Sequence, residues 1–335
     1  MKIKIYAPLS IHEIGQRPRQ EDSLYPQTAD DSVRIFVLCD GIGGHQSGDR
    51  ASQTVSRAIY DHIASQPEGQ VLSDDVLLEA LDKAWRELDK LDDGSVRKPG
   101  TTLTLLCLHN GGATMLHIGD SRIYHVRGAD GQLLYQSRDH TVVMELYQSG
   151  EISYQEMLHS AQRHVLSRAM MPGIESRVRP DIVHTTDVLP GDWFFLCSDG
   201  MLEQMDNQQL AELLCDDMSD EEKRDRLVEL TAGNHDNHTA WLIHIKEVTR
   251  EAADIHQPND EPTSRANALL IHNDADDDTE VELLAEGQEE DYVTQFADPV
   301  AKKKSSWWKS RFWIVALIAL VAAVAIYLAF SQIAN

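Results

Sequence analysis

Four acidic residues stand where apolar runs of the sequence begin or end. Asp40 follows RIFVLC, Asp120 follows MLHIG, Asp199 follows WFFLCS, and Asp236 precedes HTAWLIHI. A carboxylate at the end of a buried strand is costly unless it is paired or bound to a metal. One Asp-Gly pair is usually a plain turn, but four such edges predict that carboxylates gather at one place.

Such a group of carboxylates can bind hard divalent cations. Mg²⁺ and Mn²⁺ take carboxylate, carbonyl and water oxygens, and two of them sharing a carboxylate activate water and clamp a phosphoryl group. Arg17 stands four residues before Glu21 and Asp22 in GQRPRQED, so an anion binder lies beside two more acids. The pattern predicts metal-assisted hydrolysis of a phosphate ester.

Strands and helices must position these residues. Short apolar or alternating segments bounded by Gly, Asp or Asn are typical of strands, and they occupy 34–39, 102–108, 113–119, 123–126, 193–197 and 240–245. Apolar spacing near 3.6 residues predicts helices over 47–65, 73–91 and 219–232. The stretches 103–126 and 177–245 are interpreted as hairpins with short turns, which predicts antiparallel sheets with helices outside them.

Together these residues form an ordered set of motifs over about residues 10–245. The set resembles the metal-dependent protein phosphatases of the PPM type, and its bacterial members in particular. Its members are Arg17-x-x-x-Glu21-Asp22, Asp40-Gly41-x-Gly43-Gly44-His45, Gly100-Thr101-Thr102, Gly119-Asp120-Ser121-Arg122-x-Tyr124, Asp139-His140-Thr141, Ser198-Asp199-Gly200 and Asp236-Asn237-x-Thr239.

The resemblance implies an α+β fold, a β-sandwich of two antiparallel sheets flanked by helices, with two Mn²⁺ or Mg²⁺ ions at one end. By that resemblance Asp40 bridges both metals and the Gly41 carbonyl binds one of them. Asp199 and Asp236 complete the other. Further roles implied by the resemblance are metal contact, direct or through water, for Glu21 and Asp22; phosphate binding for Arg17; and help with a weaker third metal for Asp139.

Two departures from the family pattern concern histidines. Eukaryotic relatives carry a His, thought to act as general acid, where this chain has Ile42. A metal-bound water, His45 or His140 are the alternatives for protonating the leaving group, although a His beside a Gly-rich turn is as often structural. His235 and His238 flank Asp236 and are interpreted as packing around the metal site.

Two further assignments stay open at this stage. Asp120 is interpreted as organising a turn more than binding metal. Residues 140–173 form an insertion that the resemblance implies is a flap beside the cleft. Its Arg163, His164 and Arg168 could recognise an acidic phosphopeptide or simply cover a sheet edge.

The net charge of the chain limits the kinds of molecule that it is expected to bind. The net charge is −25, of which the first 250 residues carry −16; 251–298 holds 15 acidic residues and one basic, and 299–335 five basic and none acidic. Acidity of this degree argues against nucleic acid as a partner. The four cysteines lie far apart without metal-ligand spacing, so buried reduced thiols are expected.

The last 85 residues predict a membrane anchor. Residues 312–330 are 19 residues without a charge, about 28 Å as a helix, which matches the hydrocarbon core of a bilayer. The expected organisation is a catalytic domain over 1–250, a disordered acidic linker over 251–298, a basic juxtamembrane segment over 299–311, the transmembrane helix over 312–330 and a tail over 331–335. The positive-inside rule then predicts a single-pass protein with a cytoplasmic catalytic domain, and the resemblance to bacterial members of the family implies a bacterial inner membrane.

The predicted function is metal-dependent hydrolysis of phosphoserine and phosphothreonine in proteins, opposing a Ser/Thr kinase from the membrane surface. One alternative is a membrane-tethered pseudophosphatase that only docks a partner; degraded metal acids would indicate it, and the acids are present. Another alternative is hydrolysis of a small phosphorylated metabolite with the same metals.

Overall fold

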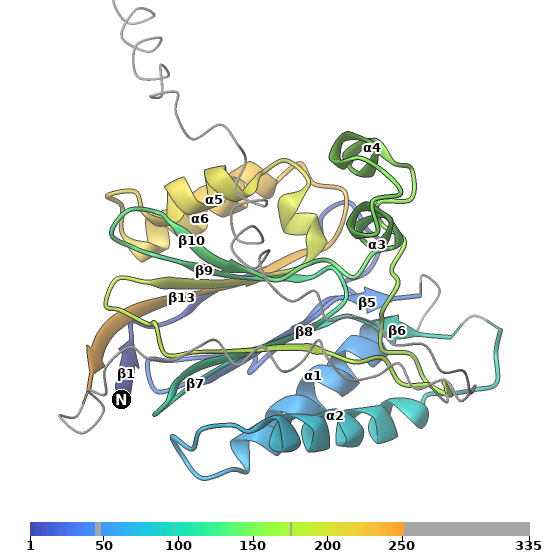
Figure 1. Ribbon diagram of the computed structural model, residues 1–335, viewed down its shortest axis with the longest axis horizontal. Helices are drawn as coiled ribbons and strands as arrows, with labels where there is room; N and C mark the ends of the chain where they lie inside the picture. Colours follow the sequence, from blue (N-terminus) through green and yellow to red (C-terminus); the bar gives the residue numbers. More distant parts are fainter. Residues whose placement is uncertain (44–47, 97, 175, 251–335) are drawn as a thin grey trace, which may run out of the picture. The chain divides into compact units, whose positions relative to one another are not determined.

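The fold is known from a computed structural model that describes residues 1–43, 48–96, 98–174 and 176–250. The chain divides into two units, residues 1–273 and 274–335, and all described residues belong to the first. Two antiparallel sheets face each other there, with helices on both outer faces (Figure 1).

The first sheet has six strands and the second has five. The first is ordered β1 (Lys2–Ile5), β13 (His238–Thr249), β12 (Trp193–Cys197), β9 (Arg122–Val126), β10 (Leu133–Gln136), with β2 (Leu9–Glu13) also on β13. The second is ordered β11 (Asp181–Thr185), β8 (Gly112–Ile118), β7 (Leu103–His109), β4 (Ile35–Cys39), β3 (Ser23–Tyr25). A two-stranded pair, β5 (Gly41–Ile42) and β6 (Gly100–Thr101), continues from β4.

Alternation along the central strands explains the layers, because successive side chains point to opposite faces of a sheet. In β4, Phe36 and Leu38 join a core between the sheets with Phe194 of β12, whereas Val37 and Cys39 join the core under α1 (Gly48–Ala64) and α2 (Asp74–Asp89). The opposite face of the first sheet packs in the same way against α5 (Asn207–Leu214) and α6 (Asp220–Thr231).

The remaining elements of the described residues are three short helices in the connections between strands. A 3₁₀ helix, η1 (Asp199–Leu202), follows β12, and two short helices, α3 (Val142–Gln148) and α4 (Tyr154–His159), lie in the insertion. In Figure 1, α3 and α4 stand at the end of the sandwich where β5 and β6 are found.

The predicted strands and helices and the α+β class are confirmed for the described residues, but the hairpin interpretation was only partly right. Strands β7 and β8 do form a tight hairpin. β9 then crosses to the other sheet, and the β12–β13 pair is joined through α5 and α6, not through a short turn. A strand such as β9 is buried on both faces, so its apolar pattern does not reveal which sheet it joins.

The predicted acidic linker, basic segment, transmembrane helix and tail all lie outside the described residues. Within the part of the chain that the structure describes, no helix combines the length and apolar character needed to cross a bilayer.

Candidate active site

Strand ends bring the predicted acids together at one end of the sandwich. Asp40 follows β4, and Asp22 precedes β3. Asp199 begins η1, with Ser198 between it and the end of β12, and Asp236 stands two residues before β13. β3 pairs with β4 and β12 pairs with β13, so each sheet contributes two of these acids.

Asp22 is held by hydroxyl groups of the opposite sheet. Its side chain is buried, and Oδ2 accepts a hydrogen bond of 2.8 Å from Ser198 Oγ. Ser198 Oγ also accepts from the Thr239 amide at 3.0 Å, and Thr239 gives Asp22 a further side-chain hydrogen bond. The Ser-Asp-Gly and Asp-Asn-x-Thr motifs thus meet at Asp22.

Asp40 is fixed through its backbone. Its amide donates to Thr102 Oγ1 at 2.9 Å, and its carbonyl accepts from the Thr102 amide and from Thr101 Oγ1, each at 2.9 Å. At Gly41 a Cβ atom would lie 2.4 Å from the Gly48 carbonyl oxygen and 2.5 Å from that of Glu21. Only glycine allows these backbone segments to approach so closely.

Arg17 lies beside the acids. Its Nη2 is 2.6 Å from Asp236 Oδ2, and the guanidinium remains half exposed. Glu203, which the sequence did not single out, accepts hydrogen bonds from the His235 and Asp236 amides at 3.0 and 2.9 Å. It lies between β12 and α5, one residue after η1, and no motif pointed to it.

Burial, and after it repulsion between neighbouring carboxylates, raises the pKa of several of these acids. Burial, opposed by hydroxyl hydrogen bonds and followed by repulsion from Asp199 and Asp236, raises the pKa of Asp22 to about 7. Burial and the charges of Asp22, Asp199 and Asp120 raise the pKa of Asp40 well above its usual range. Burial and the nearby charge of Asp49 likewise raise the pKa of Glu21. The site holds more negative charge than its own basic residues balance.

Asp120 and Asp139 differ in their surroundings. Burial, followed by the charge of Asp199, raises the pKa of Asp120 to about 8, and the charge of Asp120 in turn acts on Asp40. Together, Glu21, Asp22, Asp40, Asp120, Asp199 and Asp236 are called the acid cluster. Both carboxylate oxygens of Asp139 accept from Arg122, Oδ1 from Nε and Oδ2 from Nη2, at 2.7 Å each. Its assignment to a third metal stays a prediction.

The histidines that the sequence singled out differ in burial and in their contacts. His140 is buried and uses both ring nitrogens within the protein, so it is no free proton donor. His238 is buried against the Asp236 carbonyl at 3.0 Å, whereas His235 is exposed. His164 of the insertion, which the sequence suggested only for peptide recognition, reaches Asp199 with Nδ1 3.5 Å from Oδ2. His45 lies outside the described residues.

A second group of potential ligands lies apart from these acids. Among the described residues, His117, His140 and Asp181 form one group whose ligand atoms all lie within 4.8 Å of one another. This group shares no residue with the predicted metal set, so it does not test that set.

Comparisons with known proteins identify the family of the chain. The family model described as Protein phosphatase 2C matches residues 11–232. Serine/threonine protein phosphatase PstP of Mycobacterium tuberculosis is 32% identical over 233 residues, which are 68% of this chain and 43% of PstP. This chain therefore matches less than half of PstP's length.

One further relative and one solved structure are similar to this chain. Protein phosphatase PhpP of Streptococcus pneumoniae is 28% identical over 224 residues, 65% of this chain and 88% of PhpP. A crystal structure of the PstP catalytic domain in complex with two manganese ions superimposes with a TM-score of 0.60 at 28% identity, over 73% of this chain and all of that one.

The family match spans most of the described sandwich and includes the insertion, and every residue of the acid cluster except Asp236 falls inside it. The chain belongs to the protein phosphatase 2C family, and with it to the serine/threonine protein phosphatases.

Proposed function

We propose that this protein hydrolyses phosphoserine and phosphothreonine in proteins with two bound divalent cations, Mn²⁺ or Mg²⁺. The observation that carries the proposal is the convergence of Asp22, Asp40, Asp199 and Asp236 beside Arg17. Carboxylates this close to one another, one of them buried and three half-buried, are stable together only when protons or cations neutralise them. An all-oxygen donor set fits Mn²⁺ and Mg²⁺. The relative PstP, whose structure contains two manganese ions, supports the same reading.

Asp40, the Gly41 carbonyl, Asp199 and Asp236 would hold the two cations, with Glu21 and Asp22 nearby. When bound, such cations activate water and neutralise the charge that develops on the phosphoryl group. Asp120 is our preferred contributor to a weaker third cation because it shares the charge environment of Asp199. Asp139 is the alternative, and its bidentate pair with Arg122 would have to open.

Arg17 would bind the phosphate of the substrate. A guanidinium offers two parallel N–H groups to phosphate oxygens. Its 2.6 Å contact with Asp236 holds it at the edge of the acid cluster while the other N–H groups remain accessible.

The first test is hydrolysis of phosphothreonine peptides by the purified protein. We expect no turnover in EDTA, turnover with millimolar Mn²⁺, and a higher kcat/KM for phosphopeptides than for free phosphoesters. Arg17→Ala should lower kcat/KM by about 10- to 100-fold, mainly through KM, since a charge-assisted phosphate contact is lost. Arg19→Ala is the matched control, an exposed arginine two residues away.

Two results would contradict the proposal. Absence of metal-dependent turnover on every peptide would favour the pseudophosphatase alternative, and a preference for free phosphoesters would favour a metabolite as substrate.

Membrane tethering and opposition to a kinase are further proposals. Support for the tether comes from the uncharged residues 312–330 and the five basic residues before them. The acidic stretch 251–298 would act as a self-repelling spacer. The kinase proposal rests only on the chemistry of the substrate.

Cell fractionation tests the tether. The full chain should sediment with membranes and resist extraction by salt and carbonate, because an apolar helix is held by the bilayer and not by charge. A chain ending at residue 250 should appear in the soluble fraction. A full chain that is released by high salt alone would contradict a spanning helix and indicate surface binding through the basic segment.

A further inference from the structure

A buried histidine connects the acid cluster to the insertion. The His140 amide donates to the Gly119 carbonyl at 2.9 Å, and the Gly119 amide donates to His140 Nδ1 at 3.1 Å. Gly119 directly precedes Asp120 and has a φ of +108°. A Cβ atom there would lie 2.6 Å from Thr102 Cγ2. The turn that carries Asp120 is therefore held in one conformation by Thr102 and His140.

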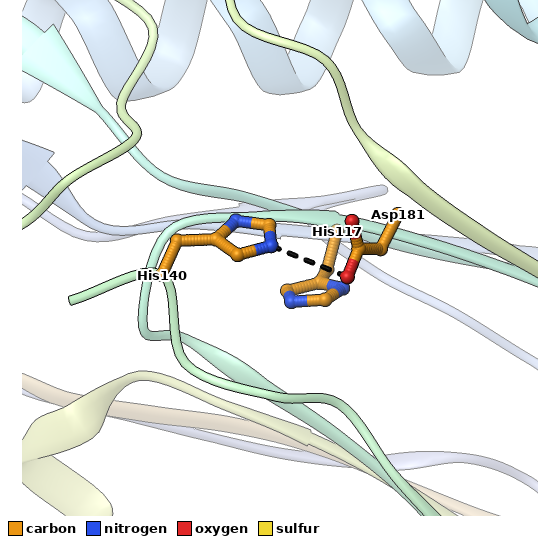
Figure 2. A group of neighbouring side chains, drawn as sticks. All are labelled: His117, His140 and Asp181. Atoms are coloured by element: carbon orange, nitrogen blue, oxygen red, sulfur yellow. Dashed lines mark ion pairs between the residues drawn. The ribbon is translucent and has the colours of Figure 1, made fainter. Parts of the chain in front are cut away.

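The hydrogen bond from Gly119 determines the tautomer of His140. Nδ1 accepts an N–H bond, so it must present a lone pair, and the proton of a neutral ring must lie on Nε2. Nε2 is 3.3 Å from Asp181 Oδ2, and the dashed line in Figure 2 marks this ion pair. An ionised carboxylate can only accept, so Asp181 stabilises the tautomer that the Gly119 amide needs.

Asp181 is held in place by two arginines. Arg168 of the insertion donates Nη1 to Oδ1 at 3.1 Å, and Arg138 Nη2 lies 3.8 Å from Oδ2. Burial raises the pKa of Asp181, but the hydrogen bond from His140 and the neighbouring His and Arg groups outweigh it and hold the pKa below its usual range. Arg168 Nη1 is also 3.3 Å from His140 Nε2. Two proton-bearing nitrogens lie this close because the carboxylate accepts from both.

Backbone hydrogen bonds connect His140 and its neighbours to the far end of the insertion. The His140 carbonyl accepts from the Ser167 amide at 2.9 Å, and the Val142 amide donates to the Val165 carbonyl at 2.8 Å. Farther along, Met170 and Thr101 exchange two backbone hydrogen bonds of 2.9 Å. Thus Asp181, Arg168 and His140 join the base of the insertion to the turn before Asp120.

A metal site is the other interpretation of this group. His117 stacks on His140 with ring centroids 4.4 Å apart, and its buried Nδ1 has no hydrogen-bond partner among the residues that the structure describes. A cation on His140 Nε2 would, however, require a ring without protons, since Nδ1 already accepts from Gly119. A metal-bound histidine normally donates its other N–H. Arg168 and Arg138 also already balance the charge of Asp181.

We propose that Asp181 is a positioning residue for the phosphatase site: it keeps the His140 proton on Nε2, leaves Nδ1 to accept from Gly119, and so fixes the turn that carries Asp120. The proposal rests on the proposed function for its effect on turnover, whereas its structural part concerns the His140 tautomer alone.

Asp181→Asn tests it in the full chain. An asparagine offers one acceptor oxygen to three donors, and its amide group can donate to Nε2. Nε2 must then lose its proton, which moves to Nδ1 opposite the Gly119 N–H. We expect ¹⁵N NMR to show His140 changing from the Nε2–H to the Nδ1–H tautomer, with a shift of the Gly119 amide signal. At saturating Mn²⁺, kcat should fall by about 10-fold or more, as outer-shell changes do, with KM changed less than about 2-fold because Arg17 is untouched.

Asp181→Glu and Asp187→Asn are the controls. The glutamate retains an acceptor-only carboxylate and should keep the Nε2–H tautomer and most of kcat. Asp187 lies two residues after β11 and pairs with Arg127 at 2.7 Å, so its replacement should change neither readout.

Three results would overturn the proposal. The first is an unchanged His140 tautomer in Asp181→Asn, and the second is a changed tautomer with unchanged kcat. The third is stoichiometric Zn²⁺ binding to the wild type that His117→Ala removes. If the wild type shows no turnover, the proposed function fails, while the tautomer and the Gly119 signal still decide the structural part.

Discussion

Replacing Asp40 with asparagine should abolish metal-dependent phosphate release and at the same time stabilise the metal-free protein. Asp40 stands at the centre of the acid cluster, and its carboxylate is the proposed bridge between two cations. Asparagine keeps the shape of the side chain but removes the charge that attracts the metals. Loss of a direct ligand should exceed the roughly 10- to 100-fold effects of outer-shell changes, so we expect kcat/KM to fall by more than about 100-fold.

The rise in metal-free stability follows from the same charges. Burial, followed by repulsion from Asp22, Asp199 and Asp120, raises the pKa of Asp40 well above its usual range. A neutral side chain at position 40 ends that repulsion, while the backbone bonds to Thr101 and Thr102 stay. The melting temperature in EDTA should rise by about a few degrees, and the further rise that Mn²⁺ gives the wild type should be lost.

The two readouts together separate a site effect from misfolding. Asp61→Asn, at an exposed ion pair within α1, is the control and should change neither. An Asp40→Asn variant that melts lower than the wild type in EDTA would contradict the picture of uncompensated repulsion. One that keeps Mn²⁺-dependent turnover would contradict the role of Asp40 at the metals.

How far the sequence predicted the site depended on how local each signal was. Asp40, Asp199 and Asp236 could be found because each interrupts an apolar run at a strand end, a pattern that follows from the cost of burying charge. The class of fold followed from strands and helices whose periodicities are strong. Family resemblance then supplied roles that spacing alone could not assign.

Contacts between distant segments were beyond the sequence. Asp181 lies 41 residues after His140 at the start of a strand, and nothing in VRPDIVH marks it as a partner. The pairing exists because β11 adds to β8 and so brings Asp181 opposite His117. Glu203 and the contact between His164 and Asp199 depend in the same way on how the segments after β10 and β12 fold back. The environment of Asp120, which the sequence attributed to a turn, became visible only once Asp199 was placed near it.

Without metal, the protein should lose stability as the pH rises from about 6.5 to 8.5. The pKa of Asp22 is raised to about 7 and that of Asp120 to about 8, from the ordinary value of 3.8. Between pH 3.8 and its raised pKa, each carboxyl is therefore protonated in the folded state but ionised in the unfolded state. Stability then falls with increasing pH, by about 1.4 kcal/mol per pH unit for each carboxyl that is protonated only in the folded state. Roughly 3 kcal/mol of the free energy of unfolding should disappear across the window, more of it from Asp120 than from Asp22.

Buried histidines define the lower end of that window. Burial lowers the pKa of both His109 and His117 to about 4, so between pH 4 and 6.5 they make stability rise with pH and oppose the carboxyls. Above pH 6.5 they are neutral in both states, and only the acid cluster contributes this slope. Urea unfolding in EDTA at half-unit steps of pH measures it, with the Asp22→Asn/Asp120→Asn double variant as the control whose profile should be flatter.

Saturating Mn²⁺ should reverse the trend in the same experiment. Cations compete with protons for the carboxylates, so they bind more tightly as the pH rises, and binding to the folded state adds stability in proportion to the logarithm of metal concentration over Kd. The difference between the Mn²⁺ and EDTA curves should therefore widen from pH 6.5 to 8.5. Parallel curves would mean that the metals bind elsewhere, and a metal-free stability that rises with pH would mean that Asp22 and Asp120 are already ionised in the folded protein.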